Sequence, residues 1–176
     1  KRRLKKVVLP SGVNFNGMPY LKTIPSIFAK SKKIFFDVAF PIFHGTKGED
    51  GAIQGLFEFS QIPYCGPRVL CASTFINKSF GKKVFGISGV KALTEVLIKR
   101  PNVGEVIDVK KLLKGHKIEF PVCAKPCNLG SSIGVSKAKN KKELYTALLE
   151  IFKIDNAALI EPFVENLVEY NIAVTK

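Results

Sequence analysis

Apolar residues in the first half of the chain form a strand-length run followed by a helical pattern. The run from Ile34 to Phe43 is almost continuously apolar, which is typical of a buried strand in a parallel sheet. Ala52 to Ser60 places its large side chains mainly on one side of a helix, with Asp50 as the predicted N-cap. Ile62 to Cys65 is predicted as a short strand. The pattern therefore predicts a β-α-β unit whose first loop, His44 to Gly51, opens where α/β sheets bind ligands.

The middle of the chain predicts a second helix and a weaker strand. The helix is expected from about Ser73 to Phe85, and it carries Lys78 and Lys82 one turn apart on the same face. Between Gly86 and Gly115 the pattern is less regular, and Ala92 to Lys99 has the apolar character of a strand. This region therefore adds a helix with two cations on one face.

The last third of the chain alternates strands with one helix. Ile118 to Pro126 is an apolar strand, and Val135 to Lys137 is its predicted hairpin partner. Asn140 and Glu143 have the spacing of a capping box, with Asn in place of Ser or Thr, at the start of a helix with an apolar stripe. Ala157 to Ile160 is predicted as a further strand. Together these elements indicate an α/β protein.

A lysine at the end of an apolar strand is followed directly by glycines and serines. Lys125 ends the strand, and Gly130, Ser131, Ser132 and Gly134 follow it. The strand fixes the ammonium group, while the glycines let backbone N–H groups and the serine hydroxyls approach anionic oxygens. In a P-loop the lysine follows the glycines, so this order predicts a different nucleotide-binding fold. A plain hairpin turn is the alternative, which two adjacent serines after a strand lysine make less favoured.

The composition is that of a globular protein. The 176 residues are 46% hydrophobic and include 14 phenylalanines, enough to build the core of one large or two small domains. No apolar run has the roughly 18–20 residues of a membrane span, and the basic start lacks the apolar segment of a signal peptide. We therefore expect a cytoplasmic protein with no membrane partner. Cys65, Cys71, Cys123 and Cys127 lack the spacing of a zinc site and are expected to be buried free thiols.

The net charge of +14 leaves two classes of protein open. A basic nucleic-acid-binding module would account for it. However, the lysines occur in small dispersed groups that are not interleaved with aromatic residues. A solvated basic surface, part of which suits an enzyme that handles ATP, is therefore the favoured interpretation, and no nucleic-acid partner is expected.

Two motifs occur in order along the chain. His44 to Gly55 has the pattern His-Gly-x-x-Gly-Glu-Asp-Gly-x-x-Gln-Gly, and Lys125 to Gly134 has the pattern Lys-Pro-x-x-x-Gly-Ser-Ser-x-Gly. With the helix-borne Lys78 between them, they resemble the D-alanine–D-alanine ligases of the ATP-grasp superfamily, although Asn77 stands where that family usually has Asp. The resemblance extends from about Phe36 to Val174. It implies that two D-alanines are joined at the expense of ATP, through a D-alanyl phosphate, to supply peptidoglycan precursors.

The resemblance also implies a fold class and a domain organisation. It predicts an α/β chain with a partial Rossmann-like N-terminal domain over residues 1–71, the small α+β central domain of an ATP-grasp fold over residues 72–160, and the start of a C-terminal domain over residues 161–176. An N-terminal glycine-rich segment and most of the C-terminal domain are expected outside these residues. The ligands of Mg²⁺ or Mn²⁺ would lie there too, so no metal ligand is predicted within the chain. The chain alone is expected to be inactive, and the full-length protein to be a homodimer.

Nucleotide binding is assigned by the resemblance to residues in the second half of the chain. Lys125 would pair with the α- and β-phosphates of ATP, and Lys78 would hold phosphate oxygens from the other side. A hinge that begins at Glu161 would hold adenine and ribose, with Glu169 accepting the ribose hydroxyls, although the spacing between these two residues is one longer than usual. The complete set is Lys78, Lys125, Gly130, Ser132, Glu161, Pro162, Phe163, Val164 and Glu169.

The first D-alanine is assigned to His44, Glu49 and Ser131. His44 and Glu49 would supply polar partners for its charged ends and for the acyl phosphate, and Ser131 would lie beside it. His44 and Ser131 are the residues with a catalytic assignment, whereas Asp50 is interpreted as structural. Two alternatives stay open: another ATP-grasp carboxylate–amine ligase, such as a D-alanine–D-lactate ligase, and a basic nucleic-acid-binding module.

Overall fold

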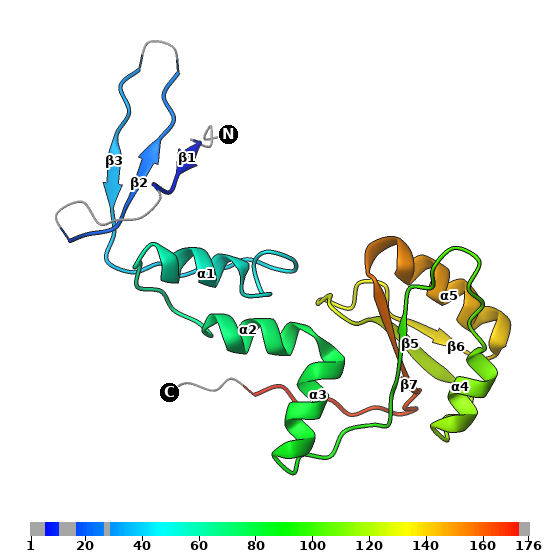
Figure 1. The fold of residues 1–176 in the computed structure, drawn as a ribbon. Coiled ribbons are helices and arrows are strands. Elements are labelled where there is room, and N and C mark those ends of the chain that lie inside the picture. The colour runs from blue at the N-terminus through cyan, green and yellow to red at the C-terminus, as the bar shows by residue number, and fades with distance from the viewer. Residues whose placement is uncertain (1–5, 11–16, 27–28, 173–176) are drawn as a thin grey trace. The chain divides into compact units, whose positions relative to one another are not determined.

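The chain forms two compact units in a computed structural model that describes residues 6–10, 17–26 and 29–172. The units are Lys1–Ile76 and Asn77–Lys176, and each has its own sheet and helices (Figure 1). The mixed helix and strand content confirms the predicted α/β class, although both sheets are antiparallel. The domain boundaries after residues 71 and 160 stay predictions. In the part of the chain that is described, no helix is long and apolar enough to cross a membrane.

The described residues of the first unit form a three-stranded antiparallel sheet and two helices. The sheet has the order β1 (Val7–Val8), β2 (Tyr20–Thr23) and β3 (Lys33–Phe35). Helices α1 (Ala52–Phe59) and α2 (Val69–Ile76) follow. Cys65 and Cys71 are free thiols but exposed, so the expectation that they are buried is wrong.

The prediction of one buried strand from Ile34 to Phe43 is wrong. Its first two residues belong to β3, which pairs with the preceding strand β2 and has exposed side chains. Further along, Ala39 forms an isolated parallel bridge with Tyr64, which is what remains of the predicted β-α-β pairing. Pro41 has no N–H group to continue a ladder. Apolar character alone therefore did not identify the strand's partner.

Helix α1 begins at Ala52, as the sequence predicted, but its N-cap differs from the predicted one. Its N-cap is Gly51, with φ of 94°, and not Asp50. The Asp50 carboxylate still accepts hydrogen bonds from the backbone N–H groups of Lys47, at 2.7 Å, and Ala52, at 3.1 Å. The bond from Lys47 is the largest cause of a lowered pKa for Asp50. Asp50 is thus a structural residue of the loop, as predicted.

The predicted helix from Ser73 to Phe85 is two helices in the structure. α2 ends at Ile76, and α3 (Lys78–Ile87) begins after Asn77. The Asn77 side chain accepts a hydrogen bond from the N–H of Phe80 at 2.8 Å, as an N-cap does. Lys78 and Lys82 remain one turn apart, at the start of α3.

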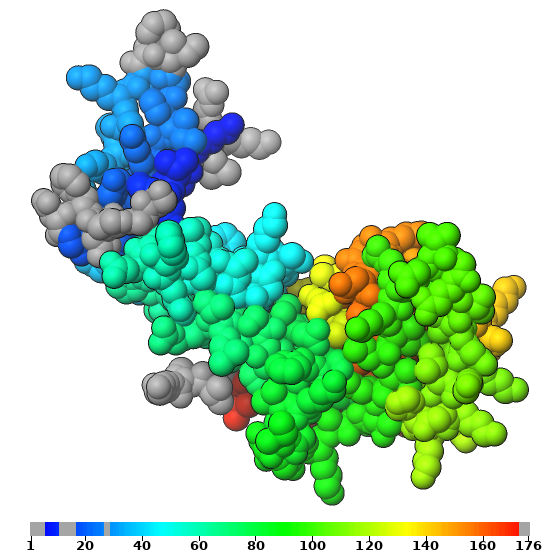
Figure 2. Space-filling model, viewed as in Figure 1, coloured from blue at the N-terminus to red at the C-terminus, as the bar shows by residue number. Residues whose placement is uncertain are grey.

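The second unit is built on a four-stranded antiparallel sheet. Its order is β4 (Val96–Lys99), β7 (Ala157–Pro162), β5 (Val122–Pro126) and β6 (Ser136–Ala138), with α4 (Val109–Gly115) and α5 (Lys141–Ile154) packed beside it. In Figure 2 the atoms of α3 and α4, in green, and of α5, in orange, pack into one body. The buried core includes Val122, Ala124, Leu144, Ile151 and Ile160.

Helix α5 begins with the capping box that the sequence predicted. The Asn140 side chain accepts a hydrogen bond from the N–H of Glu143 at 3.0 Å. The Glu143 carboxylate accepts one from the N–H of Lys139 at 2.7 Å, one residue earlier than in the standard motif. The hairpin of β5 and β6 is also confirmed, with Cys123 opposite Lys137.

Candidate active site

Lys125 and Glu161 lie on the same face of the four-stranded sheet. β5 pairs with β7 so that Cys123 lies opposite Glu161. Side chains alternate between the faces of a strand, so Lys125, two residues after Cys123, is a diagonal neighbour of Glu161. The two side chains form an ion pair. The register of the sheet therefore joins the predicted phosphate lysine to the first residue of the predicted hinge.

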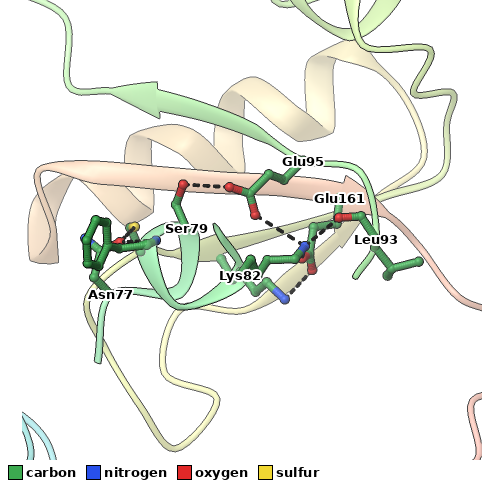
Figure 3. A network of polar contacts seen from close by, with 9 residues as sticks. Asn77, Ser79, Lys82, Leu93, Glu95 and Glu161 are labelled. Atoms are coloured by element: carbon green, nitrogen blue, oxygen red, sulfur yellow. Dashed lines mark hydrogen bonds and ion pairs between the residues drawn. The ribbon is translucent and has the colours of Figure 1, made fainter. Parts of the chain in front are cut away.

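Helix α3 supplies a second cation to Glu161. The Lys82 ammonium contacts one carboxylate oxygen of Glu161 (Figure 3). The Lys125 ammonium contacts the other oxygen. Lys82 also donates a hydrogen bond to the carbonyl of Leu93 at 2.8 Å and lies 3.3 Å from the Glu95 carboxylate. The exposed fractions of the Lys82 and Glu161 side chains are 17% and 6%. These ionic contacts are thus largely shielded from water.

Ser79 extends the same set of contacts toward the start of α3. Its hydroxyl donates a hydrogen bond to the Glu95 carboxylate at 2.6 Å (Figure 3). We call Ser79, Lys82, Glu95, Lys125 and Glu161 the Glu161 network. Its members come from α3, β5, β7 and the residue before β4, so four segments are joined by charge.

Opposing influences act on the pKa of Glu161. Burial would raise this pKa, but the hydrogen bonds from Lys125 and Lys82 outweigh burial and hold it below the ordinary value of 4.5. The carboxyl group is therefore ionised at neutral pH, and two cations balance its buried charge.

Lys78 contacts the loop that follows β5. Its ammonium donates a hydrogen bond to the carbonyl of Leu129. Burial is the first cause, and the neighbouring charge of Lys125 the second, of a lowered pKa for Lys78. An anion bound close to both ammonium groups would relieve this repulsion.

The loop itself has an unusual backbone conformation. Ser131 and Ser132, with φ of 52° and 55°, both lie in the left-handed region. Gly134 has φ of 71°, and a Cβ there would lie 2.8 Å from Pro126 Cγ, so the position requires glycine. Non-glycine residues in this conformation are uncommon, and left-handed residues occur in the concave backbone arrangements that bind anions. Both serines are exposed.

A chain of side-chain hydrogen bonds supports the start of this loop. Asn77 donates to the Asn128 side chain at 2.7 Å. Asn128 donates to the Asp155 carboxylate through its backbone N–H, at 2.7 Å, and its side chain, at 2.8 Å. An ionised Asp at position 77 could not donate the first of these bonds. Asn77, which stands where the family usually has Asp, is thus suited to its hydrogen bond with Asn128.

The predicted hinge leaves the sheet at the end of β7. Pro162 is the last residue of β7, and the N–H of Phe163 donates to the carbonyl of Pro121 at 3.0 Å. The Lys137 ammonium lies 3.9 Å from the centre of the Phe163 ring. Val164 and Glu169 are exposed, and Glu169 takes part in none of the Glu161 contacts described above.

His44 and Glu49 lie in the first unit, on the loop before α1. The Glu49 carboxylate accepts a hydrogen bond from the N–H of Gly45 at 2.6 Å, which closes the loop on itself. His44 is exposed and lines a cavity of about 220 Å³. The other lining residues are Phe43, Thr46, Lys47, Gly48 and Ile53.

Comparison with known proteins places these features in a family. The family model described as the D-ala D-ala ligase N-terminus matches residues 16–67, and that of the D-ala D-ala ligase C-terminus matches residues 89–176. The chain belongs to the D-alanine–D-alanine ligase family. The resemblance found in the sequence motifs is thereby confirmed.

Relatives and solved structures of this ligase family agree. D-alanine–D-alanine ligases of Wolinella succinogenes and Acetivibrio thermocellus are 42% and 43% identical over 81% and 77% of this chain. The chain spans 38% and 35% of those relatives. The crystal structure of the Helicobacter pylori ligase matches with a TM-score of 0.71 and 31% identity, over 91% of this chain and 46% of that one. The Bacillus anthracis ligase complexed with ATP matches with a TM-score of 0.63 and 28% identity, over 74% and 41%.

The sequence did not assign a role to three members of the Glu161 network: Ser79, Lys82 and Glu95. Lys82 was placed on the correct face of the helix by its spacing from Lys78, and that spacing was the available signal. Glu95 carried no signal, because its contact with Lys82 depends on the tertiary structure. Among residues 6–10, 17–26 and 29–172, no group of three or more His, Cys, Asp or Glu could hold a metal ion.

Proposed function

We propose that the protein that carries this sequence joins two D-alanines with hydrolysis of ATP to ADP and phosphate, and so supplies peptidoglycan precursors. The proposal concerns the whole protein, because the chain spans 38% and 35% of the related ligases. The observation that carries it is the ion pair between Lys125, at the head of the glycine- and serine-rich loop, and Glu161, at the head of the hinge segment.

ATP would bind in the second unit. Lys125 and Lys78 would hold phosphate oxygens as charge-assisted donors, together with Gly130 and Ser132 of the loop. Glu161, Pro162, Phe163 and Val164 would contact adenine, and Glu169 the ribose hydroxyls. The repulsion between Lys78 and Lys125 supports this assignment, because an anionic ligand close to both ammonium groups would relieve it. The similar ligase of Bacillus anthracis was crystallised as a complex with ATP.

The first D-alanine would bind through His44, Glu49 and Ser131. The cavity beside His44 is smaller than the roughly 300–1,000 Å³ of drug-sized ligand sites, at about 220 Å³, which suits a small amino acid. Glu49 could exchange its bond to Gly45 for one to the substrate ammonium, since that bond is exposed.

The reaction would proceed in two transfers. The carboxylate oxygen of the first D-alanine attacks the γ-phosphorus of ATP, the bond to the β-phosphate oxygen breaks, and ADP leaves. The amine of the second D-alanine then attacks the acyl carbon, the carbon–oxygen bond to phosphate breaks, and the amine loses a proton. Ser131 and His44 would orient the reacting carboxylate.

Four further features belong to the same proposal. Mg²⁺ or Mn²⁺ would neutralise phosphate charge, but the described residues do not form a site for it, so no step is assigned to the metal here. We place the protein in the cytoplasm, where ATP is available, and propose a homodimer. We propose no nucleic-acid or membrane partner.

The proposal is tested by ADP release from the protein that carries this sequence. ATP, Mg²⁺ and D-alanine should give D-alanine-dependent ADP and one D-alanyl-D-alanine per ADP. D-lactate or D-serine, offered with D-alanine, should give less mixed product than the dipeptide. Preferential formation of a mixed product would overturn the assignment of the second substrate. ADP release that does not depend on D-alanine would overturn the ligase proposal.

A further inference from the structure

Lys82 is a cation of the Glu161 network that the family resemblance leaves without a role. Its ammonium has three N–H groups, and three acceptors surround it: the Leu93 carbonyl, Glu95 and Glu161. Figure 3 shows Lys82 directed from α3 between the two carboxylates. All three N–H groups of Lys82 therefore have an acceptor within the protein, and none is left for a ligand.

Lys125 has a different set of partners. In the part of the chain that the structure describes, its ion pair is with the second oxygen of Glu161. Exchanging this carboxylate for a phosphate would keep the charge of Lys125 balanced. The exchange would, however, leave Glu161 short of one cation.

We propose that Lys82 is a positioning residue, which stays paired with Glu161 and so frees Lys125 to bind the phosphates of ATP. The inference rests on the proposed function. A buried carboxylate without a cation is costly, and Glu161 would then hold Lys125 back. Glu95 and the Leu93 carbonyl keep Lys82 in place while Lys125 moves.

The kinetic test compares three variants of the protein that carries this sequence. Lys82→Met should raise the KM for ATP by about tenfold or more and leave the KM for D-alanine within about twofold. Lys82→Arg should recover most of the loss, because it restores the charge and the donors. Lys83→Met, the exposed neighbour on the same helix, is the control and should change neither value. Equal changes in both KM values for Lys82→Met would overturn the proposal.

A double variant asks whether Lys82 acts through Glu161. In a Glu161→Gln background the charge that Lys82 balances is gone, so Lys82→Met should add less than about twofold to the KM for ATP. A full tenfold loss in that background would show that Lys82 acts elsewhere, and would contradict the proposal. Thermal melting of each variant verifies that it is folded.

A measurement without ATP separates this inference from the proposed function. The carboxyl ¹³C signal of Glu161 can be titrated in the unliganded protein. The titration midpoint of Glu161 should rise in Lys82→Met, because Glu161 then loses one of its two cations. It should stay unchanged in Lys83→Met, which keeps both cations. An unchanged midpoint in Lys82→Met would overturn the pairing role whatever the activity. Absence of ATP turnover in the unaltered protein, with a risen midpoint in the variant, would instead overturn the proposed function and leave the pairing role supported.

Discussion

The loop from His44 to Gly51 and the Glu161 network are built in different ways. The loop is closed by residues a few positions apart, with Glu49 bonded to the N–H of Gly45. The network joins α3, β5 and β7, whose residues are far apart in the sequence. An exposed local bond is exchanged for a ligand at little cost, whereas a buried set of charges has to be preformed. The comparison supports the proposed roles: an adaptable loop in the first unit, and in the second a preformed charged site in which Lys125 can exchange its partner.

The largest effect should follow from removal of the strand lysine. Lys125→Ala loses a charge-assisted contact worth roughly 1.5–3 kcal/mol, and it also leaves Glu161 with one cation fewer. We expect kcat/KM for ATP to fall at least about tenfold in a steady-state assay. Lys142→Ala, at an exposed position of α5, is the matched control. Equal losses at both positions would show that the positive charge acts diffusely.

The next largest effect should come from the backbone of the phosphate loop. Gly134→Ala places a Cβ on a left-handed residue, at roughly 1–2 kcal/mol, and 2.8 Å from Pro126 Cγ. The free energy of unfolding should fall by about that amount in urea titration. Gly86→Ala, in the last turns of α3 with nothing within 4 Å of its Cβ, should instead be neutral or stabilising. A stable Gly134→Ala variant would show that the loop is not held in the conformation described.

Local features of the fold could be predicted from the sequence. The capping box at Asn140, the β5–β6 hairpin and the positions of Lys78 and Lys125 depend on residues close in the chain. The pairing of the apolar run at Ile34 could not be predicted, because the run alone does not say which strand it joins. The break at Asn77 was hidden by the helical pattern on both sides of it. Glu95 was missed because its contacts with Lys82 and Ser79 join residues that are brought together by the tertiary structure.

A smaller effect, confined to one substrate, is expected in the first unit. His44→Ala and Glu49→Ala should raise the KM for the first D-alanine several-fold or lower kcat, and leave the KM for ATP within about threefold. The reason is that these residues would contact the amino acid and not the nucleotide. Two-substrate kinetics measures both constants. If the KM for ATP changed most, the loop would belong to the nucleotide site and the distinction between the loop and the network would fail.

The smallest effect should appear in the acid dependence of stability. The pKa of Glu161 is lowered in the folded state from 4.5, so its stabilisation is complete above pH 4.5 and is lost as the pH falls below that value through the folded pKa. Chemical unfolding between about pH 6 and pH 3 should therefore show a steeper loss for the unaltered protein than for Glu161→Gln. Glu150→Gln, which removes an exposed ion pair with Lys153, is the control and should keep the steep loss. Parallel curves for all three would mean that the Lys82 and Lys125 contacts do not stabilise the charged form.

We place the nucleotide at the Glu161 network and not at the His44 loop. Amide chemical-shift mapping of the ¹⁵N-labelled protein during addition of ATP tests this placement without relying on turnover. We predict shifts at residues 125–134 and 161–164, with residues 44–51 little changed, and a loss of these shifts in Lys125→Ala. Shifts concentrated at residues 44–51, with residues 125–134 unaffected, would contradict it.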